Sequence, residues 1–247
     1  MAVTQPKSLT LARQDSVWLI TFQVNAFTPD LISEIHSSLD LVESTPGPSA
    51  VVFASAKRIF SGGLDLMRAI QGPVGSRQFA PLGLYCLLAK LMGRLLSFSI
   101  PTIVAIEKGC YNGGFLFICA CDHRVMSDKN TYIGLKEVLM PSALPESGTG
   151  VLLTKLSPKI VKDMLLTGRD ISPQEALATQ TVDMLAPQDQ VLTKAVEWAQ
   201  SLSSLGEKRE AYGLLKRQMY GSEAALCAKA AWEYEEMVCS TKFISKL

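Results

Sequence analysis

The chain has 247 residues, enough for one large domain with a substantial core. Its 24 lysines and arginines nearly balance its 23 aspartates and glutamates, so no overall charge attracts nucleic acid or an anionic membrane. The six cysteines lack a paired metal-ligand spacing and only two histidines are present, so we expect no metal site and expect reduced thiols in the core.

Strand-like and helical segments alternate from the start of the chain. Met1–Lys7 lacks the apolar stretch of a signal peptide, and residues 8–22 predict a hairpin that turns at Gln14-Asp15. A helix is predicted to open at Thr28-Pro29, where apolar residues begin to recur at helical spacing. The helix should stop before Pro46, because proline and glycine follow there.

The same order of strand, helix and strand recurs further along, around Ile103 and again around Tyr132. The longest apolar region, residues 81–106, is interrupted by lysine, arginine and proline, so we expect no membrane span. Within it, an apolar helical stripe over 84–98 predicts core or subunit packing, with a lining for a fatty-acyl tail as the alternative. Residues 71–79 predict a loop, and the chain beyond Pro187 predicts helices.

Two glycine turns and one carboxylate stand out as candidate chemistry: Phe60–Asp65, Asn112–Gly114 and Glu137. Each turn follows a strand-like apolar run, at 50–54 and at 102–106, and so presents backbone N–H groups at the end of a buried strand. Two such turns could converge on one oxygen and stabilise negative charge on it. A nearby carboxylate could then remove a proton from the adjacent carbon. The pattern therefore indicates enolate chemistry.

Three ordered segments together resemble one known family. They are Lys57–Leu66, the stretch from Pro101–Ile106 through Gly113-Gly114 to Cys121–Arg124, and Leu165–Arg169 with Ala176 and Val182-Asp183. Over most of its length the chain is thus similar to the crotonase (enoyl-CoA hydratase/isomerase) superfamily. The resemblance implies an α/β crotonase-type spiral of repeated ββα units over residues 1–190, which holds the acyl-CoA site. It also implies a C-terminal helical region over 191–247 that packs between the subunits of a homotrimer or hexamer.

The resemblance also implies an oxyanion hole formed by two backbone N–H groups. The matching positions are Gly62 and Gly113, where a closely approached backbone leaves no room for a Cβ. A helix expected to begin near Phe115 would add its partial positive charge. The stretch that starts at Gly109 is one residue shorter than the common form, so Asn112 is the alternative second donor.

The acids of the family decide its reactions. Hydratases carry two glutamates, and here Leu116 matches the first and Glu137 the second. A lone carboxylate cannot easily position and split water, but it can move a proton between two carbons. The chain therefore looks like the Δ3,Δ2-enoyl-CoA isomerases, in which the patterns of Ser61–Leu66 and Ile133–Glu137 recur. The alternatives are another crotonase reaction (hydration, dienoyl-CoA isomerisation or thioester hydrolysis) and a non-catalytic fold that binds acyl-CoA or a protein.

Several candidates have both a functional and a structural interpretation. Burial among apolar neighbours would raise the pKa of Glu137 toward the range of a useful base. If the side chain is instead exposed or ion-paired, its pKa would not be raised in this way. Asp65 is expected to cap a helix that starts near Leu66, and His123 to be a structural partner. Lys57-Arg58 could meet coenzyme A phosphates or remain solvated. The residues expected to contact substrate are Lys57, Arg58, Ile59, Ser61, Leu64, Asp65, Leu66, Asn112, Gly114 and Leu116.

The resemblance implies no cofactor, since coenzyme A is part of the substrate, and a role in β-oxidation of unsaturated fatty acids. Ser245-Lys246-Leu247 matches the peroxisomal address that an import receptor reads. We therefore expect the protein in the peroxisomal matrix or a related organelle.

Overall fold

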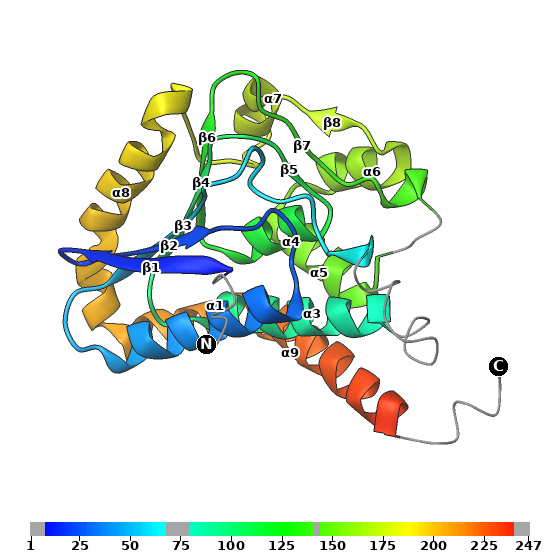
Figure 1. Ribbon diagram of the computed structural model, residues 1–247, viewed down its shortest axis with the longest axis horizontal. Helices are drawn as coiled ribbons and strands as arrows, with labels where there is room; N and C mark the ends of the chain where they lie inside the picture. Colours follow the sequence, from blue (N-terminus) through cyan, green and yellow to red (C-terminus); the bar gives the residue numbers. More distant parts are fainter. Residues whose placement is uncertain (1–7, 68–79, 141–143, 240–247) are drawn as a thin grey trace, which may run out of the picture.

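The computed structural model describes residues 8–67, 80–140 and 144–239, apart from the side chains at 80–81 and 231–239. The expected loop at 71–79 and the terminal tripeptide lie outside these residues. A six-stranded sheet and a smaller three-stranded sheet form the centre, with helices around them (Figure 1). Among the described helices, none is both long enough and apolar enough to cross a membrane.

The larger sheet contains all strands longer than two residues in the described part of the chain. In spatial order its strands are β1 (Leu9–Gln14), β2 (Val17–Phe22), β3 (Ala50–Ser55), β4 (Thr102–Ile106), β6 (His123–Ser127) and β9 (Met184–Ala186). The hairpin prediction is confirmed, because β1 and β2 pair antiparallel and Asp15 turns the chain with a φ of 52°. The remaining neighbours pair parallel, so the chain must cross the sheet between them, and helices make these crossings.

Helices cover both faces of this sheet. One face is covered by α1 (Pro29–Ser44), α3 (Ala80–Ser97) and α4 (Gly113–Ala120), and the other by α8 (Val191–Leu202), which Figure 1 shows in yellow. Strand β3 shows the alternation, because Val51 and Phe53 join the first core whereas Val52 and Ala54 pack with α8. A strand buried on both faces reads as a continuous apolar run, which is why the sequence indicated it.

Local signals set the helix ends. Thr28 caps α1, since its Oγ1 accepts a hydrogen bond from the Leu31 N–H at 3.1 Å, and Pro29 occupies the first turn, where its missing N–H costs nothing. Ser157 caps α6 (Pro158–Thr167) and Ser172 caps α7 (Pro173–Ala178) in the same way. Helix starts of this kind can be predicted from sequence because every partner lies within a few residues.

The C-terminal helices belong to the same core as the strands. After two short 3-10 helices, η2 (Gln188–Gln190) and η3 (Ser203–Glu207), the long helix α9 (Arg209–Cys239) packs along α3. The expected α/β architecture is thus confirmed, including its helical C-terminal region. The apolar stripe of α3 is mainly core, because Leu84, Leu88, Leu91 and Leu95 are buried. A role of the region in subunit packing stays a prediction.

The close approach of η3 to the start of β3 provides a stability test. A Cβ at Gly206 would overlap the backbone carbonyl of Ser49, which is fully buried. Gly206→Ala should therefore lower the free energy of unfolding by about 3 kcal/mol, because backbone cannot yield as a side chain can. Gly221 in α9 has open space around its Cα, so Gly221→Ala should instead add about 0.5–1 kcal/mol. Urea denaturation measures both, and equal effects would contradict the packing argument.

Candidate active site

A cavity of about 420 Å³ lies between the two glycine turns and the start of η1 (Glu137–Leu139). The residues of the sequence prediction that line it are Gly62, Leu64, Leu66, Asn112, Gly113, Leu116 and Glu137. The fold therefore brings together three segments that are widely separated along the chain. The lining is mostly apolar, as expected of a pocket that takes a hydrocarbon chain.

The first glycine turn runs beside the chain that enters α1. The Gly62 N–H donates to the Asn25 carbonyl at 2.8 Å, and the Gly63 N–H to the Ser61 hydroxyl at 3.1 Å. The prediction that Gly62 is an oxyanion donor is therefore wrong, because its N–H is already used. The Leu64 N–H, in contrast, donates to no residue in the described part of the chain.

The second turn leads directly into α4. This helix begins at Gly113, two residues before the expected start near Phe115, and its first N–H groups have no partner within the helix. The Gly113 N–H is free of any acceptor among the described residues, whereas the Asn112 N–H donates to the Gly134 carbonyl at 3.0 Å. Asn112 is thus excluded as the second backbone donor, and Gly113 is left.

The two free N–H groups lie close together. Gly63 has a φ of 104°, and a Cβ on it would lie 3.0 Å from the Gly113 nitrogen. A Cβ on Gly113 would lie 3.5 Å from the Leu64 nitrogen. Leu64 and Gly113 both line the cavity, so their N–H groups form the pair that can accept one oxygen.

Glu137 supplies a buried carboxyl group to this cavity. Its side chain is 9% exposed, and its Oε2 has no hydrogen-bond partner among the described residues. Burial raises the pKa of Glu137, and the nearby backbone N–H groups of Glu137 and Lys136 only partly oppose the shift. A carboxyl group of raised pKa with a free oxygen is suited to act as a general base that takes up a proton and releases it again.

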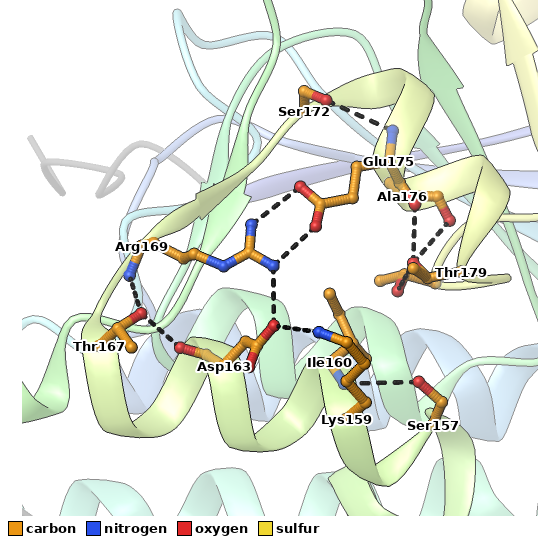
Figure 2. Close-up of polar contacts among 11 residues, drawn as sticks. Ser157, Lys159, Ile160, Asp163, Thr167, Arg169, Ser172, Glu175, Ala176 and Thr179 are labelled. Atoms are coloured by element: carbon orange, nitrogen blue, oxygen red, sulfur yellow. Dashed lines mark hydrogen bonds and ion pairs between the residues drawn. The ribbon is translucent and has the colours of Figure 1, made fainter.

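The small sheet fixes where Glu137 lies. It consists of β5 (Cys110–Tyr111), β7 (Ile133–Gly134) and β8 (Asp170–Ile171), and only Leu135 and Lys136 separate β7 from Glu137. In Figure 2, Arg169 beside β8 makes paired hydrogen bonds to Glu175 at 2.6 and 2.9 Å and a third to Asp163 at 3.2 Å. Asp170 forms an ion pair with Lys136 at 2.6 Å. The ion pair therefore links the residue before η1 to β8, and Arg169 links the start of β8 to α6 and α7.

Other predicted contacts lie outside the cavity lining, namely Lys57, Arg58, Ile59, Ser61, Asp65 and Gly114. Lys57 and Arg58 are exposed, and their contact with coenzyme A phosphates stays a prediction. Gly114 is needed for packing, since a Cβ there would come within 2.6 Å of Ser61 Cβ. A helix does start at Leu66, as expected. His123 stacks on Trp198 with ring centroids 4.4 Å apart, which agrees with a structural role.

Part of the lining was not predicted from the sequence, namely Leu82, Tyr85, Met140, Leu144 and Pro145. Tyr85 is the notable addition, because its hydroxyl lies 2.9 Å from the Ser147 hydroxyl and burial raises its pKa to about 12. It therefore stays protonated at neutral pH. The described lining thus contains one side chain that can act as a base, Glu137.

Comparison with known proteins places the chain in a family. The model of the enoyl-CoA hydratase/isomerase family matches residues 12–245. The fatty acid oxidation complex subunit alpha of Idiomarina loihiensis is 29% identical over 212 residues, which are 80% of this chain and 28% of that protein. The chain therefore spans less than a third of that relative's length.

Solved structures share the fold. An enoyl-CoA hydratase from Mycobacterium marinum superposes with a TM-score of 0.79 and 21% identity, covering 93% of this chain and 98% of that one. The human mitochondrial delta3-delta2-enoyl-CoA isomerase superposes with a TM-score of 0.80 and 22% identity, covering 96% and 93%. Because a hydratase and an isomerase match equally well at such low identity, the likeness does not select a reaction.

Proposed function

The chain belongs to the enoyl-CoA hydratase/isomerase family, and from that premise we propose that it is a Δ3,Δ2-enoyl-CoA isomerase. Its substrate is a fatty 3-enoyl-CoA and its product the trans-2-enoyl-CoA. No cofactor takes part, because the thioester itself stabilises the carbanion that forms at C2.

The reaction uses two proton transfers. The thioester oxygen accepts hydrogen bonds from the N–H groups of Leu64 and Gly113 while Glu137 removes a proton from C2. The resulting dienolate carries its negative charge on that oxygen, and each donor of this kind contributes about 3–4 kcal/mol to the transition state. Glu137 then returns the proton to C4, and the double bond moves between C2 and C3.

The observation that carries this proposal is that Glu137 supplies the one carboxyl group in the described lining of the cavity, and that its Oε2 has no hydrogen-bond partner there. Hydration needs one group to activate water and a second to deliver a proton. The residue of α4 that lines the cavity together with Glu137 is Leu116, which is apolar. That side chain is 1% exposed and cannot orient water. One carboxyl group suffices for a proton shuttle between two carbons, which supports isomerisation over hydration.

The test is product analysis with purified protein. A 3-enoyl-CoA and a 2-enoyl-CoA are incubated separately, and the position of the double bond and any 3-hydroxyacyl-CoA are followed by NMR and mass spectrometry. Conversion of the first without hydration of the second supports the proposal. Robust hydration favours a hydratase, and no change in either favours a fold that binds without catalysis.

Leu116 offers a prediction about this choice. The unmodified protein should show little hydratase activity, whereas Leu116→Glu should introduce a measurable rate by restoring a second acid beside Glu137. The two carboxyl groups would then lie close together, and repulsion between their negative charges would raise the pKa of one of them. Leu116→Gln is the control, because it has nearly the same shape without the acid. The single-acid argument fails if the unmodified protein forms 3-hydroxyacyl-CoA readily.

A further inference from the structure

Asn112 lies in one of the three segments that meet at the cavity, and its side chain makes hydrogen bonds to the other two. Its side-chain Nδ2 donates to the Gly62 carbonyl at 3.3 Å, in the first glycine turn. Its Oδ1 accepts from the Lys136 N–H at 2.8 Å, directly before Glu137. Asn112 itself immediately precedes Gly113, the first residue of α4.

The backbone of Asn112 is held in an unfavourable conformation. Its φ is 52° and its ψ is −128°, a combination that glycine adopts readily and an L side chain rarely does. A non-glycine residue persists there only when its surroundings fix it. The fixing contacts are the two side-chain bonds and the 3.0 Å bond from the Asn112 N–H to the Gly134 carbonyl.

One Nδ2 hydrogen and the Oδ1 of this side chain are already used in bonds within the protein, although the residue lines the cavity. Its amide connects the first glycine turn to the segment that carries Glu137. Both the free N–H pair and Glu137 must hold fixed positions relative to one thioester, and a displacement of about 1 Å can lower a rate about 100-fold.

We propose that Asn112 is a positioning residue that holds the Leu64 and Gly113 donors in register with Glu137. Its function rests on the proposed isomerase reaction, but the clamp itself is a property of the free protein. The clamp therefore has a readout that requires no substrate: the Lys136 amide is protected from exchange by the Asn112 side chain.

The test variant is Asn112→Gly, since glycine fits the same backbone conformation and removes both side-chain bonds. Asn130→Gly is the matched control, because Asn130 also has a positive φ, 56°, but is exposed and away from the cavity lining. Both variants are expected to fold, as shown by circular dichroism and by melting temperatures close to that of the unmodified protein.

In substrate-free Asn112→Gly, amide exchange at Lys136 should rise about tenfold, because its acceptor is gone. With a 3-enoyl-CoA, kcat should fall about 10- to 100-fold while KM changes less than about threefold. The acidic limb of the kcat/KM profile should move to lower pH, because a less firmly held Glu137 admits water and its pKa falls. Asn130→Gly should alter none of these.

Unchanged exchange at Lys136 would overturn the clamp, whatever the activity. Raised exchange with unchanged kcat and pH profile would overturn the positioning role. If the unmodified protein converts no 3-enoyl-CoA, the proposed function fails, and the exchange measurement still decides whether the clamp exists.

Discussion

Glu137→Gln should lower kcat for a 3-enoyl-CoA by about a thousandfold, because the amide retains the shape of the side chain and cannot take up a proton. Binding of a saturated acyl-CoA, measured by calorimetry, should change little, since the cavity walls and the oxyanion donors are untouched. A loss in kcat with an intact dissociation constant is the signature of a group that acts only on the reacting atoms.

Glu146→Gln is the control for that result. Glu146 lies nine residues further along, at the exposed start of α5 (Glu146–Lys155), and is not part of the cavity lining. The same chemical change there should leave kcat within about twofold. If Glu137→Gln kept most of its turnover, the base would have to be another group and the proposed mechanism would fail.

The same variant should also change how stability depends on pH. Burial raises the pKa of Glu137 in the folded state, so between the unfolded and folded pKa values the native protein binds more protons than the unfolded chain. Stability then falls as pH rises through that window. Glu137→Gln should therefore melt at a higher temperature than the unmodified protein at pH 8, and the difference should vanish near pH 4. A constant difference would contradict the burial of an ionisable group.

Gly113→Ala should lower kcat/KM by about 100- to 1,000-fold, as much as losing one oxyanion-hole donor, because the added methyl group would hold the thioester oxygen away from the N–H groups. The added Cβ would make a tight contact of 3.0 Å with Leu88 Cδ2 and would lie 3.5 Å from the Leu64 nitrogen, so it would occupy space beside the two donors and displace the thioester oxygen. Steady-state kinetics with a 3-enoyl-CoA measure the loss. Thermal melting shows whether it exceeds what destabilisation would explain.

Gly62→Ala is the matched control in the other glycine turn. Around Gly62 a Cβ would meet Ile59 at 3.6 Å and the Asn25 oxygen at 3.8 Å, which are ordinary contacts. Because the Gly62 N–H already donates to Asn25, the substitution should leave kcat/KM within a few-fold. Equal losses in the two variants would return Gly62 to the oxyanion hole and remove Leu64 from it.

The sequence determined the elements whose partners lie nearby. The hairpin at Asp15, the capped helix that starts at Thr28 and the buried strand at Val51 were all predictable, because turn chemistry, capping and side-chain period are local properties. Three motifs in a fixed order also sufficed to recognise the family. The same motif alignment predicted Glu137 as the single acid, and its burial in the cavity agrees with that prediction.

Only the tertiary structure decided which backbone groups are free. The Gly62 N–H cannot serve an oxyanion because it donates to the carbonyl of Asn25, which lies much earlier in the sequence. The N–H of Leu64, two positions later, has no such partner among the described residues. Asn112 looked like an alternative donor, yet contacts with Gly134 and Lys136 make it a link between segments. Hydrogen-bond partners of this kind depend on how distant segments pack, and a linear pattern of residue types carries no record of that pairing.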